Sequence, residues 1–196
     1  MRARTRTAAA GVLAMFALGG CTTTVAGVAA PATTPAGAGS GLPARTKDLS
    51  LRDVDPCKLL TDTQLNQLKE NGAPRLVDRA SWRDGPTCAF DVDAAQPSYT
   101  YYLETVPNYG IEDWVGGTHH KTSMTQQPVD VPGFPALVIY RPSQGIQDCE
   151  TLVGVGDGQT LRAQMAPDNS SFTQQQLCDM STTVAKMAVE TLETLK

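Results

Sequence analysis

Five cysteines constrain the fold of this 196-residue chain more than any other feature of its sequence. Cys21 lies near the N-terminus, and the other four are Cys57, Cys88, Cys149 and Cys178. Four cysteines in a small exported domain indicate two disulfides, for which three pairings exist. We favour Cys57–Cys88 and Cys149–Cys178, because each pair encloses one predicted helix and one predicted strand, although the sequence alone leaves the other pairings open.

The first twenty residues have the composition of a bacterial signal peptide. Three arginines in the first seven residues precede an apolar stretch at 8–18, and Leu18-Gly19-Gly20-Cys21 follows. A basic start, a short apolar middle and small residues at the cleavage site are the three parts of such a peptide. The cysteine after the small pair indicates a lipobox. We expect cleavage between Gly20 and Cys21, a diacylglyceryl group on the Cys21 sulfur, and a further acyl chain such as palmitate on the freed amine.

These features predict a lipoprotein on the extracytoplasmic face of the cell membrane, held there by the lipid on Cys21. Two acyl chains suffice for stable anchoring. Cleavage removes three arginines and no acid, so the net charge falls from −4 to −7. With this charge and no basic run, we expect no binding to nucleic acid. No apolar run reaches the roughly 18 residues that a transmembrane helix needs.

The composition divides the chain into a signal peptide (1–20), a tether (21–48) and one domain (49–196). The tether is rich in Ala, Thr, Gly and Pro, and it cannot bury enough apolar surface to offset the entropy of ordering. About 27 flexible residues reach roughly 30 Å. A hydrophobic content of 41% is enough for a packed core in the remaining domain.

The domain begins and ends with helix signals, and strand signals fill the region between them. Asp55-Pro56 and a capping box from Thr61 to Gln64 predict a first helix, and Ser170 or Ser171 begins a long final helix. We predict strands at 75–82, 87–93, 99–106, 129–131, 136–140, 148–156 and 159–165, and a short helix at 110–115. This order predicts an α+β fold, in which an N-terminal and a long C-terminal helix pack on a curved antiparallel sheet stabilised by two disulfides.

Several of these features together resemble one protein family. They are the lipobox, the tether, the stretch Val54-Asp55-Pro56-Cys57-Lys58-Leu59-Leu60-Thr61, an aromatic residue (Phe90) shortly after Cys88, and Cys178 in the final helix. The chain resembles the actinobacterial, mycobacterial-type cell-envelope lipoproteins with a four-cysteine domain of unknown function, of the LprB/LprC kind. The resemblance implies lipid anchoring and two disulfides, and it implies no catalytic residue. Phe90 departs from the tryptophan that commonly follows this cysteine directly in the family.

The sequence offers little that would carry catalysis or bind a metal. His119 and His120 are adjacent, so their side chains diverge and cannot readily chelate one metal; we interpret them as solvated loop histidines. Glu112 and Asp113 are interpreted as acids at a helix start. The glycines at 154–158 indicate a hairpin, because a strand rather than a helix follows them. We therefore predict no enzyme, no metal and no cofactor.

Aromatic residues of the middle region are the best candidates for a binding surface. Tyr99 and Tyr101 share one face of a predicted strand and Tyr102 takes the other, so one face is core and the other could line a cleft. We name Tyr99, Tyr101 and Trp114 as candidate ligand-facing aromatics. The main hypothesis is a monomeric, non-catalytic lipoprotein that binds an envelope ligand or a partner protein. The alternative is a cell-wall-modifying hydrolase, which would need His119 or His120 beside a serine and a carboxylate.

Overall fold

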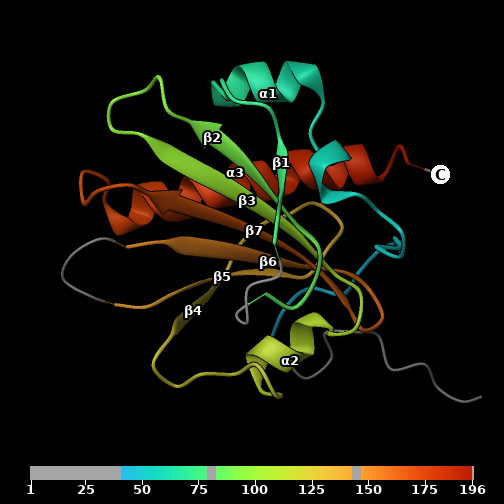
Figure 1. The fold of residues 1–196 in the computed structure, drawn as a ribbon. Coiled ribbons are helices and arrows are strands. Elements are labelled where there is room, and N and C mark those ends of the chain that lie inside the picture. The colour runs from blue at the N-terminus through green and yellow to red at the C-terminus, as the bar shows by residue number, and fades with distance from the viewer. Residues whose placement is uncertain (1–40, 79–82, 143–146, 196) are drawn as a thin grey trace, which may run out of the picture. The chain divides into compact units, whose positions relative to one another are not determined.

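The computed structural model describes residues 41–78, 83–142 and 147–195, which form an α+β fold around one antiparallel sheet (Figure 1). Seven strands follow the order β1-β2-β3-β7-β6-β5-β4, and the sheet is not closed. The strands are β1 (Arg75–Val77), β2 (Thr87–Val92), β3 (Tyr99–Val106), β4 (Thr125–Pro128), β5 (Ala136–Tyr140), β6 (Cys149–Gly156) and β7 (Gln159–Pro167). The predicted fold class is confirmed.

Helices cover the two faces unequally. The long α3 (Gln174–Leu192) packs on β6, β7 and β3, and Figure 1 shows it running behind the sheet. The short η1 (Pro56–Lys58) contacts β1, β2 and β3, and α1 (Asp62–Leu68) is joined to α3 by a hydrogen bond from Gln64 Nε2 to the Met187 carbonyl (3.0 Å). Of the helices in the described ranges, α2 (Ile111–Val115) alone lies on the other face, where it contacts β6.

Side chains alternate between the two faces along each central strand, as the pleat requires. In β7, Leu161, Ala163 and Met165 belong to the main core beneath α3, whereas Arg162 and Gln164 point to the opposite face. A smaller apolar cluster, which includes Trp114, Leu137, Ile139 and Leu152, lies on that opposite face. The sheet therefore separates a large apolar core beneath α3 from a smaller core on the opposite face that combines apolar and charged side chains.

The predicted end of the first strand and the predicted start of the final helix are wrong. The strand predicted at 75–82 ends at Val77, and its residues 79–82 lie outside the described ranges. Helix α3 begins after Thr173, not at Ser170 or Ser171, because Thr173 forms a capping box with Gln176. Ser171 instead donates its backbone N–H to the Asn169 side chain in the preceding turn. The prediction from Asp55-Pro56 and Thr61 is confirmed, since Asp55 caps η1 and Thr61 caps α1 with Gln64.

The strand predicted at 129–131 is also wrong. The strand that pairs with β5 is β4, and Val131 forms only an isolated bridge to Phe134. β4 is an edge strand of sequence TQQP, whose residues are half-buried or exposed. An edge strand needs no apolar alternation, so the composition of this segment gave no strand signal.

Both favoured disulfides are present. Cys57–Cys88 joins η1 to β2, and Cys149–Cys178 joins β6 to α3, with Cα–Cα distances of 5.1 and 5.0 Å. Each bond closes a loop of about 30 residues, which in the chain-entropy account contributes roughly 3.5–4 kcal/mol to stability. The two bonds clamp the elements that cover one face of the sheet.

Contacts with the sheet begin before residue 49. Leu42 is 8% exposed and packs in the smaller apolar cluster. The Thr46 N–H donates to the Gly133 carbonyl, and the Arg45 side chain contacts Asp48 and Asp157. The described part of the predicted tether, 41–48, is therefore attached to the domain.

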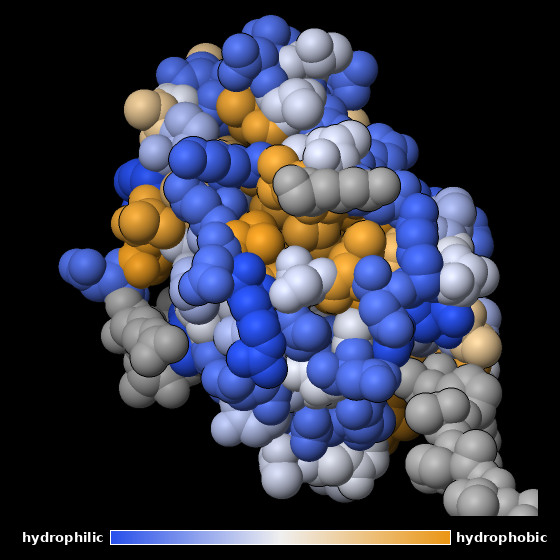
Figure 2. Space-filling view, turned by 90° about the vertical axis from the view of Figure 1, so that its right-hand side faces the viewer, coloured by the Kyte–Doolittle hydropathy of each residue, from blue (hydrophilic) through white to orange (hydrophobic). Residues whose placement is uncertain are grey.

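The surface at the end of α3 is partly apolar. Figure 2 views this side and shows hydrophobic side chains gathered in a hollow within a mostly hydrophilic surface. Leu195, just after α3, is 48% exposed. Among the described residues, no helix is long and apolar enough to span a bilayer.

Candidate functional site

The sheet face opposite α3 carries charged side chains at the centre of the sheet. Glu104 on β3 lies opposite Arg162 on β7, and Glu150 on β6 lies opposite Gln164 on β7. Glu104 is 0% exposed and Arg162 is 9% exposed. Buried ions are costly unless they are paired and hydrogen-bonded, so the arrangement of their partners determines the structure on this face.

Glu104 organises the loop between β1 and β2. Its carboxylate accepts hydrogen bonds from Arg83 Nη1 (3.2 Å), from Arg162 Nη1 (3.1 Å) and from the backbone N–H groups of Asp84 and Gly85. A Cβ on Gly85 would lie 1.9 Å from the carbonyl oxygen of Thr105, so only glycine lets the loop approach this closely. The loop thus covers part of the charged face.

Arg162 makes a second, bidentate pair with Glu150. Its Nε donates to Oε2 (2.8 Å) and its Nη2 donates to Oε1 (2.6 Å), the geometry of a strong charge-assisted pair. Burial lowers the pKa of Arg162, but the charges and hydrogen bonds of Glu150 and Glu104 outweigh it and hold this pKa above its ordinary value. Arg162 is therefore a permanent cation between two carboxylates.

Arg83 completes the network from the loop side. Its Nη2 donates to Gln164 Oε1 (2.7 Å), and its guanidinium lies 4.8 Å from the centre of the Tyr102 ring. Burial, followed by repulsion from Arg162, lowers the pKa of Arg83. The contacts with Glu104, Gln164 and Tyr102 hold this guanidinium in place.

A cavity of about 230 Å³ opens beside the network. Glu150 and Arg162 contribute to its charged wall, and Trp114, Met124 and Ile139 provide an apolar wall. The described residues that line it are Asp84, Trp114, His119, Lys121, Met124, Gln126, Ile139, Arg141, Asp148, Glu150 and Arg162. Its volume lies below the roughly 300–1,000 Å³ of pockets for drug-sized ligands, so it suits only a smaller molecule, and charged groups facing an apolar wall are typical of a site that orients its ligand.

Asp148 is a charged group of this cavity that forms no ion pair among the described residues. Its Oδ2 accepts a hydrogen bond from Gln164 Nε2 (2.6 Å). Burial raises the pKa of Asp148, and repulsion from the neighbouring Glu150 raises it further. The charge of Arg162 lowers this pKa in part, although the guanidinium itself is bonded to Glu150 and Glu104. The ionised carboxylate of Asp148 is therefore electrostatically destabilised in the folded protein.

His119 lies in the cavity wall, so its interpretation as a solvated loop histidine is wrong. Its ring stacks on Trp114 with 4.6 Å between centroids, and its Nε2 lies 3.1 Å from Asp84 Oδ1. The Tyr109 ring packs against it at 4.3 Å. His120 is exposed, although its Nδ1 contacts the Trp114 carbonyl (3.2 Å). The two histidines are adjacent in the sequence, which could not show that Trp114 of α2 stacks on His119 and not on His120.

Among the described lining residues, no nucleophile is paired with His119. The described lining residues include no serine, threonine or cysteine. The Thr118 hydroxyl lies 3.1 Å from His119 Nδ1, but it also contacts Asp113 and is not among the lining residues. Within the described ranges, no group of three or more His, Cys, Asp or Glu residues could hold a metal ion.

The three predicted ligand-facing aromatics are placed on opposite sides of the sheet. Trp114 lines the cavity, although it is itself buried. Tyr101 is 3% exposed and belongs to the core beneath α3, where burial raises the pKa of its hydroxyl. Tyr99 packs edge-on against Tyr101 and Phe172 on the same side. The row formed by Tyr99 and Tyr101 is thus the core row, and Tyr102 faces the charged network.

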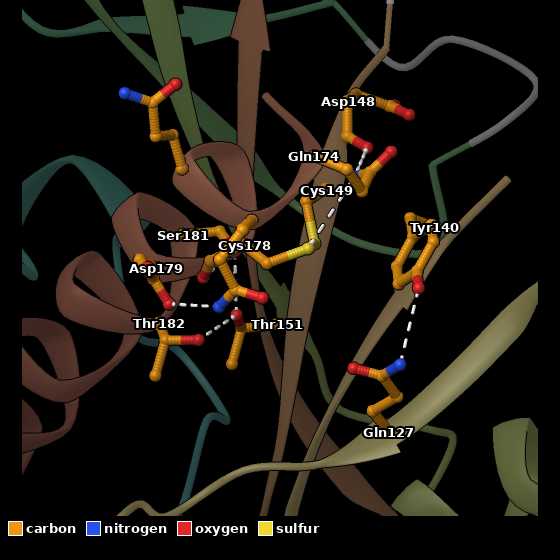
Figure 3. Close-up of a disulfide and its surroundings, with 12 residues drawn as sticks. Gln127, Tyr140, Asp148, Cys149, Thr151, Gln174, Cys178, Asp179, Ser181 and Thr182 are labelled. Atoms are coloured by element: carbon orange, nitrogen blue, oxygen red, sulfur yellow. Dashed lines mark hydrogen bonds between the residues drawn. A yellow bond between two sulfur atoms is a disulfide. The ribbon is translucent and has the colours of Figure 1, made fainter. Parts of the chain in front are cut away.

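A second cavity, of about 310 Å³, lies beside the Cys149–Cys178 disulfide. Figure 3 shows the disulfide joining α3 to β6, with Tyr140 and Gln127 across from it and bonded to each other. Gln174 Nε2 donates to the Asp148 carbonyl and lies 3.6 Å from the Cys178 sulfur. The lining is of amide, hydroxyl and aliphatic groups with one carboxylate, Asp179, so this cavity offers few charges to a ligand.

The charged network was missed in the sequence, although a signal for it exists. Glu104, Glu150 and Arg162 are each flanked by strand residues that point to the main core. A charged residue in the middle of a predicted strand, on the face opposite the apolar one, marks such a position. The other predicted site residues, Gly20 and Cys21, lie outside the described residues.

Comparison with known proteins assigns a family but no activity. The family described as Protein of unknown function (DUF3558) matches residues 16–191. The match covers most of the chain, so the protein belongs to this family. No curated protein and no solved structure matches it.

Proposed function

We propose that this member of the DUF3558 family is a lipid-anchored extracytoplasmic protein whose domain binds a small polar ligand without transforming it. The binding site is the cavity lined by Trp114, His119, Asp148 and Arg162. Within the family, we place the chain with the actinobacterial envelope lipoproteins of the LprB/LprC kind, on the strength of the stretch from Val54 to Thr61 and of the lipobox.

The observation that carries the binding proposal is a destabilised carboxylate in a preformed cavity. A buried charge contributes little to stability even when paired, and an incompletely paired one costs stability. Asp148 sits beside Glu150 in a lined cavity, where a ligand could supply the missing partner. Binding accounts for this arrangement, whereas a purely structural role does not.

The hydrolase alternative has one supporting contact, between His119 and Asp84. A hydrolytic triad also needs a hydroxyl or thiol that reaches both the histidine and the substrate. The described lining of the cavity supplies neither, and the hydroxyl of Thr118 already contacts Asp113. We therefore favour binding without catalysis.

Anchoring is supported by the N-terminal sequence and is consistent with the disulfides. Disulfides persist in oxidising compartments outside the cytoplasm, and the chain has two. Cys21 directly follows the small pair Gly19-Gly20 after a short apolar stretch. These features support export followed by lipidation at Cys21.

The binding proposal is tested without assuming the ligand's identity. The full-length protein is purified from membranes in mild detergent, and the small molecules it retains are analysed by mass spectrometry. We expect a retained molecule in the wild type and in Val129→Trp, which narrows only the second cavity, and its loss in Met124→Trp, which fills the first. Thermal unfolding of both variants verifies that they are folded. No retained molecule, or equal retention in Met124→Trp, would overturn the proposal.

The anchoring proposal is tested by detergent-phase partition. We expect the wild type and Thr22→Ala in the detergent phase and Cys21→Ala in the aqueous phase, with a mass increase on the wild-type N-terminal peptide. An aqueous wild type with unmodified Cys21 would contradict anchoring.

A further inference from the structure

The charges that line the cavity indicate what kind of molecule it binds, and this inference rests on the proposed function. Three carboxylates, of Asp84, Asp148 and Glu150, face the cavity together with three cations, of Lys121, Arg141 and Arg162. Arg162 is bonded to Glu150, so that pair is already neutralised. The remaining groups are two acids and two bases with unequal surroundings.

The two acids lie in the more buried part of the site. Asp148 accepts a hydrogen bond from the Gln164 amide and has no cation bonded to it among the described residues. Asp84 contacts His119, and its distance to Arg162 Nη1 is 3.9 Å. A donor with a positive charge that enters the cavity would gain from both carboxylates.

The two free bases lie at the exposed part of the lining. Lys121 follows α2 and Arg141 directly follows β5, and both residues are exposed. In the described ranges, neither forms an ion pair. Two cations at the mouth of a cavity favour an anionic group there.

We propose that the ligand is a small amino carboxylate, which places its ammonium group at Asp148 and Asp84 and its carboxylate at Arg141 and Lys121. Its hydrocarbon portion contacts Trp114, Met124 and Ile139, the apolar wall of the same cavity. A ligand of zero net charge matches a lining whose formal charges cancel. A simple amine or a simple carboxylate would satisfy only one of the two groups.

The test uses matched probes and isothermal titration calorimetry on the full-length protein in detergent, freed of any retained molecule. The probes are a series of ω-amino carboxylates from glycine to 6-aminohexanoate, with hexylamine and hexanoate as the single-charge controls. We expect at least one amino carboxylate to bind about 10–100-fold more tightly than either control, because each charged hydrogen bond contributes about 1.5–3 kcal/mol.

Two variants assign the ends of the ligand. Asp148→Asn should weaken the amino carboxylate by about tenfold or more, whereas Asp130→Asn, a change on an exposed loop, should not. Arg141→Gln should weaken the amino carboxylate and leave the weak binding of hexylamine unchanged, and Arg52→Gln is its exposed control. Since Arg141 is exposed, this variant is expected to fold normally.

The outcomes separate this inference from the proposed function. Equal binding of hexylamine and the amino carboxylates, tightest binding of hexanoate, or no effect of Arg141→Gln would overturn the inference. If every probe fails while a retained molecule is still lost in Met124→Trp, the ligand class is wrong and the binding function stands. If no retained molecule is found either, both fail.

Discussion

The two faces of the sheet bury side chains of opposite character from the same strands. On the α3 side, β7 contributes Leu161, Ala163 and Met165 to an apolar core that two disulfides clamp. On the other side, the same strand contributes Arg162 and Gln164 to a charged network. That network is covered by a loop and the short α2 instead of a long helix.

This difference separates stability from specificity. Burying apolar area contributes about 25 cal/mol per Å² wherever it occurs, whereas a buried ion pair offsets its own desolvation at best. The α3 face therefore stabilises the fold, and the opposite face needs another reason to keep its charges. We infer that this reason is recognition of a charged ligand.

The largest loss of stability is expected when the central charge of the network, that of Glu104, is removed. Glu104→Gln keeps the shape of the side chain but removes the carboxylate charge to which Arg83 and Arg162 donate, so we expect a loss of about 3–5 kcal/mol in the free energy of unfolding. Urea denaturation measures this loss. Glu190→Gln, on the exposed side of α3, is the control and should change stability by less than about 0.5 kcal/mol. A loss equal to the control would mean that the network does not hold the loop at Asp84 and Gly85.

The second test weakens the clamped face. Replacing Cys149 and Cys178 together by alanine should cost about 2–4 kcal/mol, because the unfolded chain regains the freedom of a closed loop. The Cys57–Cys88 disulfide closes a loop of similar length, with a sequence separation of 31 residues against 29. Replacing Cys57 and Cys88 together by alanine should therefore lower the free energy of unfolding by a similar amount. Denaturation of the wild type and the two double variants in the absence of reductant measures both losses. A loss below about 1 kcal/mol for either pair would contradict its structural role.

A smaller effect is expected from the loop that covers the charged face. Gly85→Ala forces the loop away from Thr105, and we expect a loss of about 1–3 kcal/mol, as for other overpacked sites. Gly116→Ala is the matched control, since its added Cβ meets nothing within 4 Å. Thermal unfolding at one pH compares the two. Equal melting temperatures would show that the loop can move without cost.

The smallest effect has the opposite sign. Asp148→Asn removes a carboxylate that burial and Glu150 destabilise, so we expect it to stabilise the free protein at neutral pH by less than about 1 kcal/mol. The pKa of Asp148 is higher in the folded than in the unfolded chain. The wild type therefore regains stability relative to the variant as the pH falls through the folded pKa towards the unfolded value. Unfolding measured from neutral to acidic pH tests this, and a variant less stable at neutral pH would contradict it.

The contrast between the faces also explains what the sequence could predict. β3 and β5 were predicted with the bounds that the structure gives, because Tyr99–Val106 and Ala136–Tyr140 are rich in strand-forming residues. Both disulfides follow from the elements that their cysteines join. The elements of the apolar face can thus be predicted from the residue types and their alternation within each short segment.

The charged face leaves a weaker signal, because a charged residue within a predicted strand marks a position without showing its partners. Arg83, Glu104 and Arg162 are far apart in the chain, and only the strand register and the fold of a loop bring them together. His119 was misassigned for the same reason, since its partners Trp114 and Asp84 are set by tertiary structure. A single sequence shows that these charges exist and does not show which of them meet.

The attachment of the segment at Leu42–Leu49 has a mechanical consequence. Leu42 packs beside Trp114, Arg45 contacts Asp157 in the β6–β7 turn, and the Leu49 N–H donates to the Val155 carbonyl. Tension applied to the chain ahead of residue 42 would first act on Leu42, which lies in the apolar cluster on the side of the sheet that holds the ligand cavity. Lys47 pairs with Glu193 at the C-terminal end of α3 (2.6 Å), so the disulfide-bonded helix would bear force only after the contacts of Leu42 and Arg45 had given way. A stretched N-terminus would therefore disturb the side of the ligand cavity first.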